Sequence, residues 1–248
     1  MIRSLVCGLA GLCACVTAAA QDAREIIRRA DEKARGKTSE AEMVIRTTRP
    51  AWKREMAVHT WMSGNDYAVI LVLSPAKDKG TVFLKRKKEV WNWLPTLERS
   101  IKLPPSMMTQ SWMGTDFTND DLVKESSIVD DYDHRFLSDT TVAGRDSYLI
   151  EMIPKPDAAV VWGKIIVSVD KKDYLQLHSR FYDDDGVLVN TMNGYDVKVM
   201  DGRLIPTRLE MIPADKKNQK TEIIYNLIQF NRPLADNFFT LDKMRNLK

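Results

Sequence analysis

From Thr38 to residue 230, apolar and polar side chains alternate with a period of two, and short turn segments interrupt the pattern repeatedly. A period of two is typical of β-strands, because successive side chains of a strand point to opposite faces of a sheet. β-branched and aromatic residues, which favour strands, are concentrated between the turns. This pattern predicts a mainly β protein.

The pattern divides into thirteen segments with short connections. Turn signals such as Asp201-Gly202 are typical of hairpins between antiparallel strands. We therefore predict a meandering antiparallel sheet, interrupted at 104–125 by a loop with one or two short helices and followed from Pro233 by a terminal helical piece. The expected strands are 38–49, 52–62, 66–74, 80–86, 89–94, 98–103, 126–137, 146–153, 160–170, 174–183, 187–199, 203–212 and 219–230.

Residues 22–35 predict an amphipathic helix that ends at Gly36, and its apolar stripe requires a sheet to cover. The stripe consists of Ala23, Ile26, Ile27, Ala30 and Ala34. A meander of this size must close into a barrel or curl around something that fills its concave face. We predict an α+β, mainly β fold: an unclosed antiparallel β-barrel, formed by a curved meander sheet, with helices covering the concave face. Residues 21–248 would form one domain.

The first twenty residues have the layout of a removable export signal. Arg3 gives a positive start, and an uncharged apolar run follows at 5–16, which is too short to span a bilayer. The small residues Ala18 and Ala20 predict cleavage after Ala20. We therefore expect a periplasmic protein.

The positions of the cysteines limit the chemistry open to the mature chain. Cys7, Cys13 and Cys15 all lie within it, so the mature chain would lack thiols, which excludes disulfides, thiolate metal ligands and cysteine nucleophiles. An alternative stays open, because residues 12–15 partly resemble a lipoprotein processing box. Lipidation of Cys15 would make the protein membrane-anchored.

Charge and hydropathy exclude further classes. Without the first twenty residues the chain has 36 basic and 34 acidic residues, a net charge of +2. This balance does not predict nucleic-acid binding. No later segment is long and apolar enough to cross a membrane.

Residues 91–122 carry the most specific pattern of the chain. They contain an aromatic-x-aromatic-Leu-Pro strand at 91–95, a basic strand with Arg99 and Lys102, and the run Met-Gly-Thr-Asp-Phe-Thr-x-x-Asp-Leu at 113–122. This combination resembles the outer-membrane lipoprotein-sorting (LolA-like) family. The Gly-Thr-Asp-Phe part of the run resembles a divergent branch of that family.

The resemblance implies an unclosed β-barrel covered by helices, with an apolar interior that holds lipid or lipoprotein acyl chains on their way towards the outer membrane. It implies no catalysis and no cofactor. An inner-membrane transporter and an outer-membrane acceptor are the further partners it suggests. The best-known carriers of the family hold a helical lid shut with an arginine inside the barrel, and no position of this chain matches that arginine.

Flexible apolar side chains gather in the loop-like stretch 104–117. Methionine adapts to varied apolar partners, so the cluster favours a ligand groove. The alternative is that these side chains fill the concave face as core. Asp116 or Thr118 is expected to cap a short helix at 119–124. The candidate lipid-binding residues are Trp91, Trp93, Met107, Met108, Trp112, Met113 and Phe117.

No metal site or catalytic set is expected. Asp130 and His134 are assigned to a solvated strand edge, and 183–186 to a turn, because no calcium-loop completion follows it. The remaining histidines, His59 and His178, are distant in sequence, and there is no Gly-x-Ser-x-Gly elbow. We therefore expect a carrier without enzymatic activity. The alternative function is a periplasmic envelope regulator or adaptor that binds a protein partner on the same scaffold.

Overall fold

The computed structural model describes residues 15–124, 127–235 and 237–247. Residues 1–14 of the predicted export signal lie outside the described residues, and 15–20 form the start of a helix. Cleavage after Ala20 and lipidation of Cys15 therefore stay predictions. Among the described residues, no helix has both the length and the apolar character needed to cross a bilayer.

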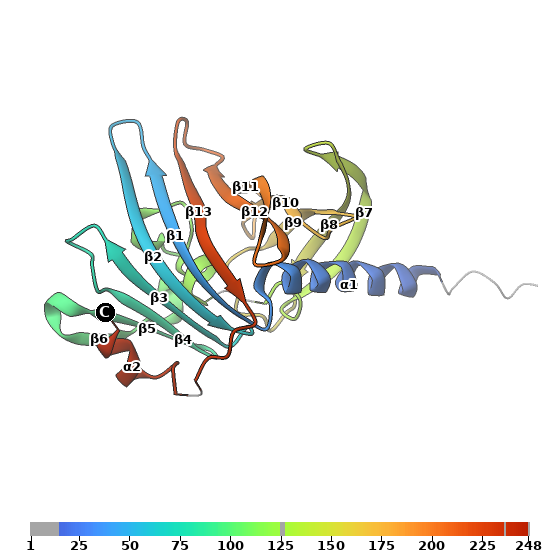
Figure 1. Ribbon diagram of the computed structural model, residues 1–248. Coiled ribbons are helices and arrows are strands. Elements are labelled where there is room, and N and C mark those ends of the chain that lie inside the picture. The colour runs from blue at the N-terminus through green and yellow to red at the C-terminus, as the bar shows by residue number, and fades with distance from the viewer. Residues whose placement is uncertain (1–14, 125–126, 236, 248) are drawn as a thin grey trace, which may run out of the picture.

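Antiparallel strands form one open sheet of thirteen strands (Figure 1), in the order β6-β5-β4-β3-β2-β1-β13-β12-β11-β10-β9-β8-β7. Strand β1 pairs with β13, which joins the two ends of the meander, while β6 and β7 form the edges. The predicted unclosed meander is confirmed. The strands are β1 (Thr38–Thr48), β2 (Lys53–Ser63), β3 (Tyr67–Ser74), β4 (Val82–Arg86), β5 (Glu89–Leu94), β6 (Arg99–Lys102), β7 (Tyr132–Val142), β8 (Arg145–Pro154), β9 (Lys164–Asp170), β10 (Gln176–Tyr182), β11 (Leu188–Met200), β12 (Arg203–Pro213) and β13 (Lys220–Phe230).

Strand β7 differs most from its predicted range of 126–137. It begins at Tyr132, because the residues before it form a turn held by side chains. The Asp131 carboxylate accepts a hydrogen bond from the Ser127 N–H (2.9 Å), and the Ser127 hydroxyl accepts one from the Asp130 N–H (3.0 Å). Such local bonds compete with the ladder of a sheet.

Helix α1 (Cys15–Arg35) crosses the concave face of the sheet and contacts β7, β9 and β12 (Figure 1). It begins before the predicted start at residue 22, and it ends as predicted. Gly36 has φ 67°, and its N–H donates to the Glu32 carbonyl (3.0 Å). This left-handed conformation suits glycine and ends the helix. Ala23, Ile27 and Ala30 are buried in the large apolar cluster between α1 and the concave face of the sheet, which we call the inner core.

The connection between β6 and β7 fills another part of the concave face. Thr118 and Asp121 form a reciprocal cap: the Thr118 hydroxyl accepts from the Asp121 N–H (3.1 Å), and the Asp121 carboxylate accepts from the Thr118 N–H (2.8 Å). Thr118 is thus the capping residue, and Asp116 has another role. The expected loop is confirmed, but its described residues form three helical turns where one or two short helices were predicted. Its helical turns are Pro105–Met107, Trp112–Gly114 and Asp120–Lys124.

Helix α2 (Leu241–Asn246) lies on the other face of the sheet, against β4 (Figure 1). A separate apolar cluster lies there, which we call the outer cluster. Strand β3 contributes Val69 and Leu71 to this cluster and Ile70 and Val72 to the inner core, so it is covered on both faces, as its apolar sequence predicts. The buried members of the outer cluster are Trp61, Val69, Leu71, Val82, Leu84, Phe239 and Met244.

Candidate functional site

A cavity of about 290 Å³ lies in the inner core, below the C-terminal part of α1. It lies at the junction of β1 and β13, and strands from both sides of this junction line it. Ile45, Val58 and Ile70 come from β1, β2 and β3, and Met211 and Ile223 come from β12 and β13. An apolar hollow of this kind has the character of a ligand site and lies at the lower end of the usual range of sizes.

A second, smaller hollow of about 110 Å³ continues this space along α1. It is lined by Ala30, Lys33 and Tyr174, among others. Because the two hollows have several lining residues in common, they lie side by side under the helix. The shared residues are Ala34, Gln176, Met192, Leu209, Tyr225 and Ile228.

The connection between β6 and β7, together with the residues that precede β9, gives the cavity its acidic side. Asp120, Asp121, Tyr132 and Trp162 line it there. The Trp162 indole N–H donates to the Asp121 carboxylate (2.8 Å). Burial raises the pKa of Asp121 to about 6, although hydrogen bonds from Thr118 and Trp162 act in the opposite direction. Burial likewise raises the pKa of Tyr132.

On the helix side, Asp31 and Arg35 line the same cavity and form an ion pair one helical turn apart (2.6 Å). Both side chains are largely buried. The pair keeps two charged groups beside an apolar space without leaving either charge unpaired.

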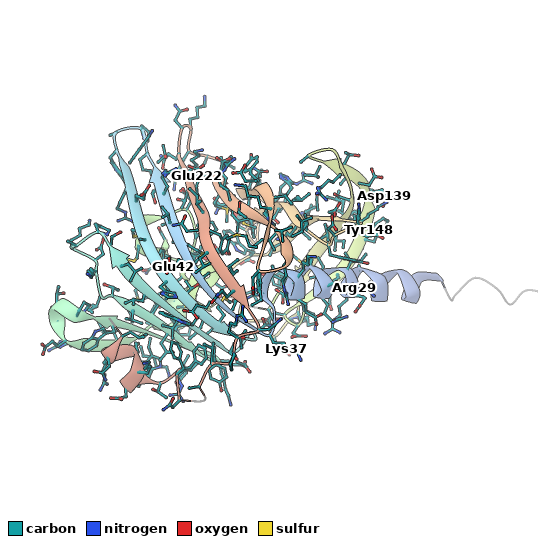
Figure 2. All side chains as sticks on the ribbon, in the orientation of Figure 1. Arg29, Lys37, Glu42, Asp139, Tyr148 and Glu222 are labelled. Atoms are coloured by element: carbon teal, nitrogen blue, oxygen red, sulfur yellow. The ribbon has the colours of Figure 1, made fainter. Side chains whose placement is uncertain are left out.

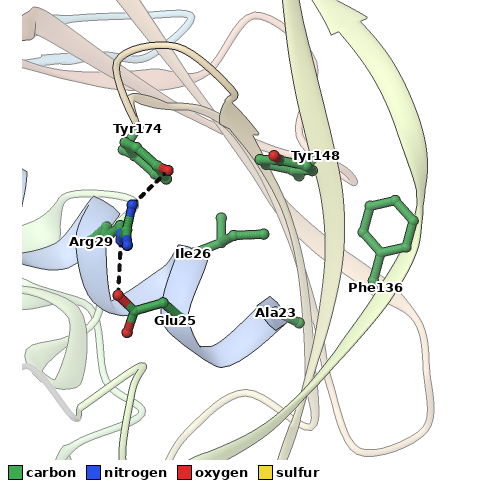
Figure 3. A pocket seen from close by; sticks show the side chains of 7 residues that line it. All are labelled: Ala23, Glu25, Ile26, Arg29, Phe136, Tyr148 and Tyr174. Atoms are coloured by element: carbon green, nitrogen blue, oxygen red, sulfur yellow. Dashed lines mark hydrogen bonds and ion pairs between the residues drawn. The ribbon is translucent and has the colours of Figure 1, made fainter. Parts of the chain in front are cut away.

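A groove of about 360 Å³ lies where α1 meets the β7 edge (Figure 3). Ala23 and Ile26 of α1 face Phe136 and Tyr148 across it. Figure 2 shows Tyr148 in the same region as Asp139 of β7 and Arg29 of α1. The groove thus has largely apolar walls.

The polar end of this groove is an ordered chain of three side chains. The Arg29 guanidinium donates to the Glu25 carboxylate (2.8 Å) and to the Tyr174 hydroxyl (2.9 Å). Hydrogen bonds from Arg28 and Arg29 lower the pKa of Glu25 to about 2. Glu25 is thus ionised at neutral pH and holds Arg29 against Tyr174.

The structure separates the seven predicted lipid-binding residues. Trp112 and Phe117 line the cavity, and Met108 is buried in the same inner core. Met107 and Met113 pack against that core and do not line the cavity.

The two remaining candidates, Trp91 and Trp93, lie on the opposite face of the sheet. They pack against the outer cluster below the C-terminal segment, and they do not line the cavity. The alternation of β5 explains this placement, because Val90 points to the inner core and its neighbours therefore point outward.

Most of the cavity lining comes from strands that the sequence alone does not assign to a site. Alternation places Met43 with Ile45, and Met56 with Val58, on single faces of their strands. The structure shows that these are inner faces. The sequence does not show which face of each strand lies on the concave side of the sheet, because this depends on where α1 packs.

No metal centre is visible in the part of the chain that the structure describes, where no group of three or more His, Cys, Asp or Glu side chains could hold an ion. The predicted solvated strand edge is wrong for His134, whereas Asp130 is exposed as predicted, although it lies in the turn before β7. His134 is 9% exposed, its Nε2 lies 2.7 Å from the Ile128 carbonyl, and burial lowers its pKa. The reason is that α1 covers β7. The predicted turn at 183–186 is confirmed, since the Asp183 carboxylate accepts from the Asp185 and Val187 N–H groups.

A family model described as "Uncharacterized protein" matches residues 64–246. No curated protein matches the chain. Solved structures with the same fold include a candidate outer membrane lipoprotein-sorting protein domain from Vibrio parahaemolyticus, with 22% identity and a TM-score of 0.80, covering 91% of this chain and 99% of that one.

Two further structures agree. A DUF1329 family protein from Desulfovibrio piger has 22% identity and a TM-score of 0.82, covering 91% of this chain and 99% of that one. A LolA superfamily protein from Nitrosomonas europaea has 23% identity and a TM-score of 0.77, covering 89% and 98%. The chain therefore belongs to the family whose model matches residues 64–246, and its fold is that of the LolA-like, outer membrane lipoprotein-sorting domains.

Proposed function

We propose that this protein is a periplasmic carrier that holds an acyl chain of a lipid or lipoprotein in the cavity between α1 and the sheet, during transfer towards the outer membrane. The observation that carries the proposal is the apolar cavity at the β1–β13 junction. Each methylene group buried there would contribute about 0.8 kcal/mol to binding. The similarity in fold to a lipoprotein-sorting domain supports the same function.

The proposed binding site differs from the sequence-based one. It includes Trp112 and Phe117, which line the cavity, with Met108 packed in the surrounding core. It leaves out Trp91 and Trp93, which pack against the outer cluster. The remaining contacts come from α1 and from β1, β2, β3, β7, β9, β10, β11, β12 and β13.

The proposal includes no chemical reaction. Each histidine has a structural partner: His59 lies 2.8 Å from the Glu40 carboxylate, and His178 lies 2.8 Å from the Asn193 side chain. His134 lies against a backbone carbonyl. None of these arrangements places a base beside a hydroxyl nucleophile, which supports carriage without catalysis.

Transfer requires a donor and an acceptor. A chain held by many buried methylenes leaves slowly unless a partner lowers the barrier. We therefore propose an inner-membrane transporter as donor and an outer-membrane acceptor, with movement of α1 as the step that opens the cavity.

The experiment is a titration of delipidated protein with a fluorescent fatty acid. Ala68 lines the cavity and is buried, so Ala68→Phe should fill part of the space and weaken binding. Ala57 lies on the opposite face of the neighbouring strand, and Ala57→Phe is the matched control. Absence of saturable binding by the unaltered protein across several lipid classes would contradict the proposal. Equal binding by the Ala68→Phe and Ala57→Phe variants would contradict it as well.

Native mass spectrometry of protein purified from cells is a second test, and it needs no substitution. A carrier should retain lipid, seen as a mass above that of the polypeptide. Loss of the extra mass on organic extraction, and its return on addition of lipid, would support carriage. A mass equal to that of the polypeptide alone, in protein purified without detergent, would contradict it.

A further inference from the structure

The groove at the β7 edge combines exposed apolar side chains with an ordered polar end. Phe136 is 40% exposed and lines the groove opposite Ile26 (Figure 3). The Phe136 and Tyr148 rings lie 6.2 Å apart and nearly perpendicular, so they form a fixed aromatic wall. Together with Ala23 and Ile26, these rings form the apolar lining of the groove.

The groove and the inner hollows follow one face of α1. Ala23 and Ile26 line the groove, Ala30 lines the second hollow, and Ala34 lines both the second hollow and the cavity. Positions spaced by three or four residues share a face of a helix. The stretch from Ala23 to Ala34 is about 16 Å long at the helical rise per residue. The groove, the second hollow and the cavity therefore follow one another along this face of α1, and we call this row of spaces the track.

Small side chains keep this track open. Three of its four positions on α1 are alanines, where a larger apolar residue would pack against the sheet and fill the space. The acidic side of the cavity, with Asp121, lies at the inner end, and the aromatic wall lies at the outer end.

Tyr174 stands where the groove meets the second hollow, because it lines both. Its hydroxyl accepts from Arg29 (2.9 Å), and the Arg29 guanidinium lies 5.3 Å from the centre of its ring. Glu25 holds Arg29 in turn. These contacts are at the surface, where a hydrogen bond contributes little net free energy, so the ring can turn aside at low cost.

We infer that the groove is the outer subsite for the same ligand chain, and this inference rests on the proposed function. The methyl end of a long alkyl chain occupies the cavity, and the chain passes Tyr174, so that the methylenes nearer its head group lie against Ile26 and Phe136 and the head group stays outside. A medium-length chain fills only the inner space. The groove therefore selects long-chain amphiphiles over medium-chain ones.

The test is calorimetric titration of delipidated protein with octanoate and with palmitate, which share a carboxylate head group and differ in chain length. Phe136→Asp should weaken palmitate binding about tenfold, the loss of roughly two buried methylenes, and leave octanoate binding unchanged. Leu137→Asp is the matched control. Leu137 lies on the same strand, is 37% exposed and does not line the groove, so its substitution should change neither affinity.

The outcomes separate the two proposals. If the unaltered protein binds neither ligand, the proposed function fails. If it binds both and Phe136→Asp weakens both equally or neither, the carrier stands and the outer subsite is overturned. Phe136→Ala, which adds no charge, serves if the Asp variant does not fold, and it should again weaken palmitate alone. Tyr174→Phe, which removes the hydrogen bond from Arg29 and keeps the ring, should speed palmitate association without changing octanoate association.

Discussion

Asp116 links the connection between β6 and β7 to the sheet by a buried ion pair. Its carboxylate accepts from Arg49 (2.9 Å) and from the Thr221 hydroxyl (2.7 Å), and it is 5% exposed. Asp116→Ala would leave the Arg49 guanidinium, only 13% exposed, without this partner. We expect the free energy of unfolding to fall by about 3–5 kcal/mol, measured by urea denaturation.

The matched control for this prediction is the surface pair of Arg24 and Asp130, whose side chains are more than half exposed. Asp130→Ala should cost less than about 1 kcal/mol, because water screens the pair. Equal costs for the Asp116 and Asp130 variants would show that burial does not strengthen the inner pair.

Asp121 should make stability depend on pH. Burial raises its pKa from 3.8 to about 6, so between these values the folded protein binds a proton that the unfolded chain does not. The free energy of unfolding contributed by Asp121 is therefore greatest below about pH 4 and falls as pH rises towards 6, by about 3 kcal/mol in total. Asp121→Asn should remove this decline. Denaturation curves across that pH range check it, and a constant difference between the two proteins would contradict it.

At the scale of elements, α2 acts as a cover for the outer cluster. Met244 is fully buried between α2 and the sheet, and Phe239 lies beside it in the same cluster. Met244→Ala should cost about 2–5 kcal/mol, because it leaves a cavity in a packed cluster. Asn246→Ala, on the same helix, is the control and should change stability by less than about 1 kcal/mol. Thermal and urea unfolding would both report the difference.

The elements were largely predictable because each depends on local sequence. Alternation gave the strands, and Gly36 gave the end of α1, since both follow from the chemistry of neighbouring residues. The start of β7 was missed because the side chains of Ser127 and Asp131 form a local turn within an otherwise strand-like stretch. Thr118 caps the helical turn, whereas Asp116 pairs with Arg49. The sequence does not decide between the two as capping residue, because the pairing of Asp116 with Arg49 is a contact between segments far apart in the chain.

The site was less predictable, because it depends on which elements pack together. Trp91, Trp93 and Trp112 are all large apolar side chains in the same part of the sequence. Trp112 lines the cavity, whereas Trp91 and Trp93 pack against the outer cluster on the opposite face of the sheet. The second hollow lies where Ala30 and Ala34 of α1 face the sheet, and the sequence does not show which strands lie opposite these residues. The pairing of β1 with β13 brings together segments far apart in the chain, and the cavity lies at that junction.

The whole molecule consists of two meanders, β1 to β6 and β7 to β13, that meet at the β1–β13 pair. Ile45 and Ile223 line the cavity from the two sides of this pair. A ligand chain in the cavity therefore contacts both meanders at once, and unfolding of either must release it. Binding to the folded state alone stabilises the whole molecule rather than one half.

This arrangement predicts a single cooperative shift. Palmitate at about one hundred times its dissociation constant should raise the free energy of unfolding by about 2.7 kcal/mol and move the whole transition to higher temperature without splitting it. The Ala68→Phe variant, with its cavity partly filled, should show a much smaller shift, whereas Ala57→Phe should behave as the unaltered protein does. Differential scanning calorimetry with and without palmitate makes the comparison. A transition that splits in two on addition of palmitate would place the ligand on one meander only and not at the junction.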